Sequence, residues 1–278
     1  MRQFPPDTAV GDADESRTAK SPFGSQTLLR GLDVIGAVTD GPITLADLAT
    51  KLDLNRSTVH RLASALIARR YLTFVPRLGY QLGPELLALG YQAQQQTDLM
   101  QVSRQHLETL ASVSEDTVHL AVMDGDRVLH LAKISGKRRV EISLRVGERQ
   151  LLTPTGIGKA LLLDDGHERW VRQFKADQAN GSPPADLDTW LHSMRHYADV
   201  GYTFDLQENE DRIRCVAAPL RNAGGTIVAA ISVSGAAQYL PDERMEILAD
   251  DVTAAARMIS ADLGWSNRSG HEGGRPNA

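Results

Sequence analysis

The chain has a single cysteine, Cys215, among its 278 residues, so it cannot form an internal disulfide. Such scarcity of cysteine is typical of a reducing compartment, and we expect a cytoplasmic protein. No apolar run approaches the roughly 20 residues that a membrane-spanning helix requires. The N-terminus combines Pro5 and Pro6 with acidic residues and lacks the apolar core of a secretory signal. The sequence therefore predicts a soluble protein without a signal peptide or membrane contact.

Positive charge is also scarce, because 30 Lys and Arg stand against 35 Asp and Glu, for a net charge of −5. This total argues against a protein that binds nucleic acid over its whole surface. The charge is uneven, however: residues 26–91 hold seven basic and five acidic residues, whereas residues 92–278 hold 20 and 26. A mildly basic N-terminal part on an acidic body is expected when only one domain contacts phosphate.

Residues 44–66, TLADLATKLDLNRSTVHRLASAL, have the pattern of a helix-turn-helix. Thr44 can cap a short helix together with Asp47, and either Asn55 or Ser57 can cap a second helix after a tight turn. In both helices the apolar residues recur at helical spacing and predict a buried face. The second helix leaves a polar face outward, made of Arg56, Ser57, Thr58, His60, Arg61 and Ser64.

A polar face of this kind, rich in hydrogen-bond donors, is what a recognition helix needs to reach base edges in the major groove. The alternative is an ordinary helix pair with a solvated polar face. A helix over 26–38 precedes this stretch, and a hairpin over 71–82 follows it, with Arg77 at its tip. Residues 25–83 therefore predict a winged helix-turn-helix that binds double-stranded DNA, with Thr44 and Arg77 added to the candidate DNA contacts.

Pro84 restarts a helix that we expect to act as a linker over 84–98 and to break near Thr97 and Asp98. Leu86, Leu89 and Tyr91 have little of their own module to pack on. They predict a dimer interface, although packing within the chain is an equally open alternative.

Beyond the linker, residues 99–264 predict an α+β domain with an antiparallel sheet. Residues 1–24 and 265–278 are poor in large apolar groups, and we expect a disordered arm and tail. The predicted strands and helices of the domain follow one another as a hairpin over 117–134, a strand over 140–144, helices over 154–163, 168–174 and 187–200, strands over 202–206, 213–220 and 226–234, and a closing helix over 241–263.

Four segments, taken in order, resemble the IclR family of bacterial transcription regulators: RSTVHRLASAL, YQLGPELLALG, TGIGKALLL, and YTFDLQENEDRIRCVAAPL followed by AAISVSG. The resemblance covers roughly residues 25–264. It implies an N-terminal winged helix, a C-terminal GAF-like effector-binding domain, a homodimer or dimer of dimers on a palindromic operator, and repression or activation of catabolic genes. It also implies a small organic effector, such as a carboxylate or an aromatic compound.

Two positions depart from the family pattern. Arg212 stands where members usually have Gly, a residue that permits positive φ, so the shape of that loop or the charge near it is expected to differ. Ile157 is large at a position that some members keep small, which indicates a pocket of different shape.

The start of the predicted helix at residue 156 offers free backbone N–H groups to an anion. In the resembled family the matching positions line the effector pocket. We therefore predict a pocket with hydroxyl and amide donors at one end and aliphatic walls. The alternative is a thiol packed as a small hydrophobe and serines bonded to backbone. The predicted pocket residues are Gly156, Ile157, Asp205, Ile213, Cys215, Ser232 and Ser234.

The sequence does not favour catalysis or metal binding. Cys215 lies in mid-strand rather than at a helix N-terminus that would activate it, so pairing with His119 or His130 does not predict an enzyme. No close spacing of ligands supports a metal site, and the two histidines are expected to be satisfied or solvated on a hairpin. We expect no catalysis, metal or cofactor. An alternative function keeps DNA binding but gives the second domain a role in oligomerisation or in redox sensing through Cys215.

Overall fold

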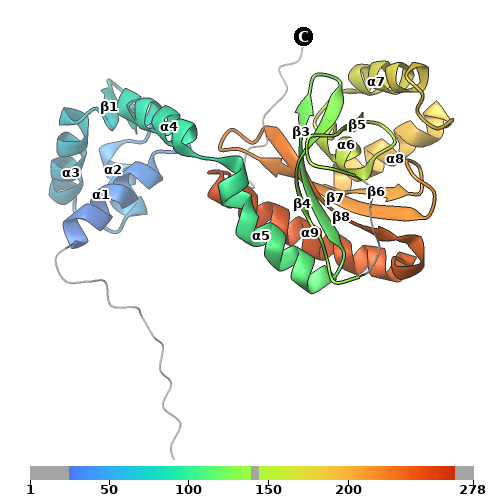
Figure 1. Ribbon diagram of the computed structural model, residues 1–278. Helices are drawn as coiled ribbons and strands as arrows, with labels where there is room; N and C mark the ends of the chain where they lie inside the picture. Colours follow the sequence, from blue (N-terminus) through green and yellow to red (C-terminus); the bar gives the residue numbers. More distant parts are fainter. Residues whose placement is uncertain (1–24, 139–143, 267–278) are drawn as a thin grey trace, which may run out of the picture. The chain divides into compact units, whose positions relative to one another are not determined.

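The computed structural model describes residues 25–138 and 144–266 (Figure 1). The predicted arm, most of the predicted tail and all but the last residue of the predicted strand over 140–144 lie outside the described residues. The chain divides between Gln94 and Gln95 into two compact units, called the N-terminal and C-terminal units below. Within the described ranges, no helix is both long and apolar enough to cross a membrane.

The N-terminal unit is a winged helix-turn-helix, as predicted. Its helices pack around a small apolar core that includes Val34, Leu48, Val59 and Leu72, each at most 1% exposed. The unit contains α1 (Gln26–Ala37), α2 (Leu45–Lys51), α3 (Arg56–Ala68), β1 (Leu72–Val75) and β2 (Gly79–Leu82), and it continues into α4 (Pro84–Gln96).

Side-chain caps set the helix starts in the helix-turn-helix. Thr44 accepts a hydrogen bond from the Asp47 N–H at 3.3 Å and donates one to the Asp47 carboxylate at 2.7 Å. Of the two candidates for the α3 cap, the structure uses Asn55, whose Oδ1 accepts from the Thr58 N–H at 2.8 Å. Ser57 donates to the same oxygen at 2.9 Å. Each cap satisfies an N–H group that the helix leaves unpaired.

The β1–β2 hairpin is held against the loop before α2. Tyr80 forms an isolated bridge with Ile43, and the ring is 5% exposed. Gly79 has φ +108°, and a Cβ there would lie 2.1 Å from the Ile43 carbonyl oxygen, so only glycine fits. The wing therefore has a fixed attachment to the helical part of its unit.

The linker helix ends where the sequence predicted a break. After α4 ends at Gln96, Asp98 caps α5 (Leu99–Ser114) by accepting from the Met100 N–H at 2.8 Å. The expected apolar face of α4 needs one correction. Leu86 is only partly exposed because it lies in the first turn, whereas Leu87 is 78% exposed.

The C-terminal unit is built on a six-stranded antiparallel sheet with strand order β5-β4-β3-β8-β7-β6. The hairpins β3–β4 and β7–β8 lie side by side because β3 pairs with β8. The strands are β3 (Thr117–Asp124), β4 (Arg127–Ile134), β5 (Arg149–Leu151), β6 (Thr203–Leu206), β7 (Ile213–Arg221) and β8 (Ile227–Ala236).

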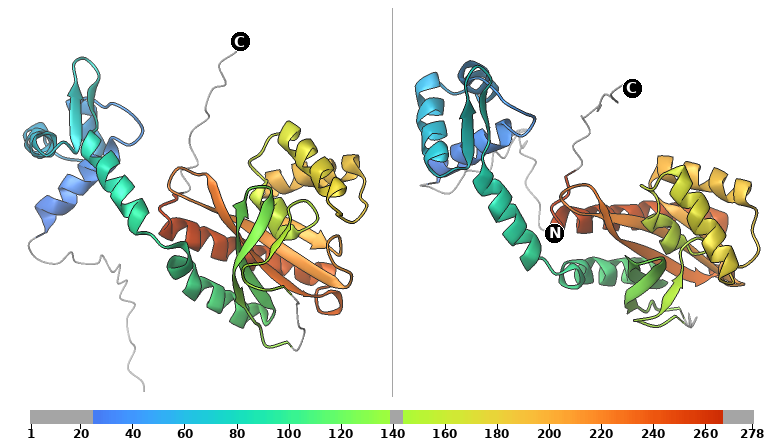
Figure 2. Two further views of the ribbon diagram at one scale, coloured as in Figure 1. Left: turned by 45° about the horizontal axis from the view of Figure 1, so that its top comes forward. Right: turned by 90° about the horizontal axis from the view of Figure 1, so that it is seen from above.

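Helices cover both faces of this sheet (Figures 1 and 2). On one face α5 and the closing helix α9 (Asp242–Asp262) pack on Leu120, Val216 and Ile231. On the other face the helices pack on residues of opposite parity, such as Ala121, Ala217 and Ala230, as strand alternation requires. These helices are α6 (Gly156–Leu161), α7 (His167–Ala179) and α8 (Leu187–Val200).

Several element boundaries of the C-terminal unit differ from expectation. Helix α7 ends at Ala179 rather than at residue 174. Helix α6 starts later than predicted because the Thr155 hydroxyl caps it, accepting from the Gly158 N–H at 3.1 Å, and it ends at Leu161. The short strand β5, at the sheet edge, was not predicted, since its three residues give no periodic signal.

Candidate functional sites

The polar face of α3 is open to solvent. Arg56, Ser57, His60, Arg61 and Ser64 are exposed, and Thr58 is partly exposed. Neither Arg56 nor Arg61 forms an ion pair with any residue that the structure describes. Val59, Leu62 and Ala63 are buried on the opposite side and fix the rotation of the helix. The helix thus presents two unpaired guanidinium groups and several hydroxyls on one surface.

The tip of the wing carries a third cation. Arg77 is exposed and has φ +70°, a left-handed conformation that closes the tight turn between β1 and β2. Thr44 is also exposed, although its hydroxyl is already bonded to Asp47. Both residues therefore lie on the surface of the N-terminal unit.

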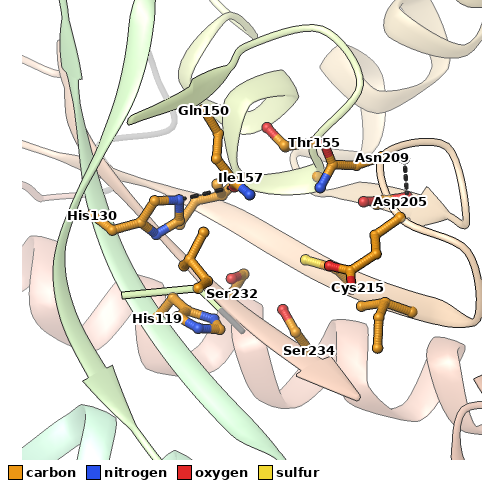
Figure 3. Close-up of a pocket in the computed structure, with 14 residues that line it drawn as sticks. His119, His130, Gln150, Thr155, Ile157, Asp205, Asn209, Cys215, Ser232 and Ser234 are labelled. Carbon is orange, nitrogen blue, oxygen red and sulfur yellow. Dashed lines mark hydrogen bonds between the residues drawn. The ribbon is translucent and has the colours of Figure 1, made fainter. Parts of the chain in front are cut away.

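A cavity of about 420 Å³, counted with its open mouth, lies between the sheet of the C-terminal unit and α6; we call it the sheet pocket. Figure 3 shows the side chains that line it. The structure brings all seven of the predicted pocket residues to its wall. Sequence reasoning missed several others that line it: His119, His130, Leu144, Gln150, Thr155, Asn209 and Glu210.

Strand register explains why distant residues meet there. Cys215 on β7 is opposite Ser234 on β8 and Asp205 on β6. In the next row on the same face, His119 on β3 is opposite Ser232 on β8. Because side chains two apart share a face, both serines point toward α6. The wall is therefore a polar patch within an otherwise apolar layer.

The start of α6 packs closely on this patch. The Gly156 carbonyl accepts from the Thr203 hydroxyl at 2.7 Å. A Cβ on Gly156 would lie 3.0 Å from Cys215 Sγ and 3.3 Å from the Asp205 nitrogen, so the glycine also serves packing. Thr155 occupies the Gly158 N–H, which leaves the N–H groups of Gly156 and Ile157 for a ligand.

Burial sets the protonation of the two acidic groups at this end. Burial raises the pKa of Asp205 to about 6, although the Lys159 ammonium opposes the rise. Asp205 Oδ1 accepts a hydrogen bond from the Glu208 N–H at 2.8 Å, which stabilises the ionised carboxylate and also opposes the rise. Lys159 is 1% exposed and bonds Glu208 at 2.6 Å. Burial, with a smaller contribution from Asp205, raises the pKa of the Cys215 thiol to about 12.

The two hairpin histidines differ from expectation. His119 and His130 are 2% and 3% exposed, and their rings meet edge to face at 5.6 Å. Among the described residues, His119 Nε2 and His130 Nδ1 have no hydrogen-bond partner. Within the part of the chain that the structure describes, they are therefore buried and not fully satisfied.

Comparison with known proteins gives the family. The family model of the bacterial transcriptional regulator IclR C-terminal domain matches residues 91–261. The family model of the IclR helix-turn-helix domain matches residues 27–76. The chain belongs to the IclR family of bacterial transcriptional regulators. The resemblance predicted from the sequence is confirmed, and the protein is a DNA-binding transcriptional regulator.

Individual proteins that are similar to this IclR-family protein are also transcriptional regulators or share its fold. It is 27% identical over 257 residues to the DNA-binding transcriptional repressor YiaJ of Escherichia coli (strain K12), covering 89% of this chain and 91% of YiaJ. It is 30% identical over 248 residues to the HTH-type transcriptional regulator BhcR of Paracoccus denitrificans, covering 87% and 88%. The crystal structure of Pseudomonas aeruginosa HmgR shares the fold, with TM-score 0.76, 23% identity and coverage of 87% and 99%.

These relatives are transcriptional regulators rather than enzymes, and no catalytic family is indicated. Within residues 25–138 and 144–266, no cluster of three His, Cys, Asp or Glu side chains could hold a metal ion.

Proposed function

We propose that this IclR-family protein binds its operator through α3 and the wing and is controlled by a small organic effector bound in the sheet pocket. Effector control is supported by one observation: polar side chains from several strands and from the start of α6 converge on one cavity. A cavity on which a few polar groups converge is typical of small-ligand sites.

On DNA, the α3 face enters the major groove, and the edges of the unit contact backbone. Arg56 and Arg61 are the main candidates for base contacts because a guanidinium group can donate two hydrogen bonds to O6 and N7 of one guanine. Ser57, Thr58, His60 and Ser64 contribute shorter contacts on the same face. Thr44 and Arg77 contact phosphates, which position the protein without reading sequence.

In the pocket, the effector is a small carboxylate or aromatic compound. A carboxylate accepts hydrogen bonds from the N–H groups of Gly156 and Ile157, while Ser232 and Ser234 supply hydroxyl donors. Cys215 and Ile213 form the apolar wall, and Asp205 is tied to the backbone of the following turn. The ligand controls DNA binding by binding two conformational populations with different affinity.

The alternative role in redox sensing is disfavoured by the environment of Cys215. The thiolate is the reactive form, and a pKa of about 12 keeps the thiol protonated at neutral pH. The residue is also only 6% exposed, which limits the access of oxidants.

Thermal unfolding of the full chain tests effector binding. All three tryptophans lie in the C-terminal unit, so their fluorescence reports that unit alone. A panel of small organic acids should contain compounds that raise its melting temperature in proportion to concentration. Absence of any stabilising acid or aromatic compound would count against effector control and favour a purely architectural domain.

Ser234→Ala is the matched variant for this test. Its affinity for a stabilising acid should fall by about 1 kcal/mol for a lost neutral hydrogen bond, or about 1.5–3 kcal/mol for one to a carboxylate. Ser112→Ala, at an exposed position of α5, is the control and should bind normally. Normal binding by Ser234→Ala would place the ligand outside the sheet pocket.

A further inference from the structure

One side of the sheet pocket is formed by two histidines that the proposed carboxylate site does not use. Figure 3 shows His119 and His130 on one side, and Asp205 and Cys215 on the opposite side. Both imidazoles are more than nine-tenths buried, and each has a nitrogen without a partner among the described residues. A buried polar atom without a partner is unfavourable, so this arrangement indicates a site that a ligand completes.

Gln150 determines which kind of group His130 can accept. The Gln150 side-chain oxygen lies 3.1 Å from His130 Nε2, and an oxygen of this type can only accept. With the Gln150 amide in this orientation, Nε2 carries the proton, and Nδ1 of the neutral ring is an acceptor without a hydrogen. The matching ligand group is a hydrogen-bond donor, which a carboxylate is not.

The surroundings favour a neutral donor over a cationic one. Burial lowers the pKa of His119 to about 3 and also lowers that of His130, so both rings are neutral near pH 7. The charged groups that act on the rings are Lys133 on β4, which disfavours further positive charge near His119, and Glu148 before β5, which acts on His130. Glu148 is exposed, so solvent screens its effect.

We propose that His119 and His130 recognise a hydroxyl group of the effector, which makes the effector a hydroxylated organic acid. This inference rests on the proposed function, because the carboxylate of the same ligand occupies the start of α6 across the pocket. Three strand spacings separate β3 from β6, or roughly 14 Å between backbones at about 4.8 Å each. The two functional groups therefore lie at opposite ends of an elongated molecule.

Matched pairs of acids test the proposal on the full chain. The probes are straight-chain acids of four to eight carbons, phenylacetate, and the same compounds carrying a hydroxyl at the far end. Calorimetric titration should show about tenfold tighter binding of the hydroxylated member at the best-fitting length, the factor that one buried hydrogen bond supplies. His130→Phe and His119→Phe should reduce this preference toward onefold. Ser234→Ala should keep the preference while weakening both members of a pair.

The outcomes separate the two proposals. Equal binding of both members by the wild type, with weakening by Ser234→Ala, would overturn histidine recognition and leave the proposed function intact. Tighter binding of the matching amino-terminated acids would overturn the neutral hydroxyl in favour of a cation. No binding by any probe would count against the carboxylate site itself. If a phenylalanine variant does not fold, as judged by tryptophan fluorescence, the wild-type comparison within each matched pair still decides the proposal.

Discussion

The backbone at Arg212 adopts a conformation that residues other than glycine rarely take. Arg212 stands where a glycine is usual in the family, and its φ is +64°, so the loop keeps the left-handed conformation with a residue that adopts it at a cost. Its N–H donates to the Gln207 side chain at 3.1 Å, and its carbonyl accepts from Ala237 at 2.7 Å. Arg212 therefore occupies the left-handed position in place of glycine, and both of its backbone polar groups are hydrogen-bonded.

His119 should make the C-terminal unit sensitive to acid. Its pKa is lowered to about 3 in the folded state because burial disfavours the charged ring, whereas the unfolded chain takes up the proton near pH 6.5. The stabilisation is present above pH 6.5 and is lost as pH falls, by about 1.4 kcal/mol per unit. His119→Phe, which cannot titrate, should therefore gain about 2 kcal/mol relative to wild type between pH 7.5 and pH 5.

Urea unfolding followed by tryptophan fluorescence measures this difference. His192→Phe changes an exposed histidine on α8 and is the matched control. The same relative stability of His119→Phe at both pH values would contradict a buried neutral imidazole.

Asp205 should couple binding of an acid to pH. A carboxylate near Asp205 favours its protonated form, so binding takes up a proton whenever Asp205 was ionised beforehand. Since its pKa is about 6, affinity should weaken as pH rises above 6, by at most about tenfold per unit. Lys159 and Glu208 are the charged neighbours of Asp205, and neither reverses the expected weakening of affinity as pH rises. Titrations at pH 6, 7 and 8 check it, and Asp205→Asn should show a flat profile.

At the scale of elements, we propose different roles on DNA for α3 and the β1–β2 hairpin. Arg56→Ala and Arg61→Ala should each weaken operator binding by roughly 1–3 kcal/mol and relax sequence preference, because both lie on the face that we propose contacts base edges. Arg77→Ala should weaken specific and scrambled duplexes about equally and lower the salt dependence, because a wing-tip cation contacts phosphate.

Gel-shift titrations on both duplexes at several salt concentrations separate these effects. Lys175→Ala, on α7 of the C-terminal unit, serves as a control for the loss of a cation. Operator binding by Arg61→Ala at the wild-type level would exclude that residue from the interface.

At the scale of the whole molecule, we predict at least a dimer joined through the N-terminal unit and α4. The reason is the run of exposed apolar side chains on α4, where Leu87, Leu89 and Tyr91 are 78%, 45% and 63% exposed. Light scattering at micromolar concentration should give at least twice the chain mass of 30.3 kDa. Leu89→Glu combined with Tyr91→Glu should shift it toward the monomer, whereas Gln94→Glu on the same helix should not. A wild-type monomer would contradict the prediction.

The sequence by itself determined the features that depend on neighbours within a few residues. The caps at Thr44 and Asn55, the buried stripe of α3 and the break at Asp98 follow from local spacing and side-chain chemistry. The family resemblance supplied seven pocket positions, and alternation correctly placed Ser232 and Ser234 on one face.

Only the tertiary structure decided how the pocket is completed. His119 and Ser232 are opposite one another although more than a hundred residues separate them, and no local pattern encodes that register. Gln150 reaches His130 from β5, a strand too short to predict, and that contact sets the tautomer. Burial then lowers the histidine pKa values and raises that of Asp205, because desolvation depends on everything packed around a group rather than on its neighbours in sequence.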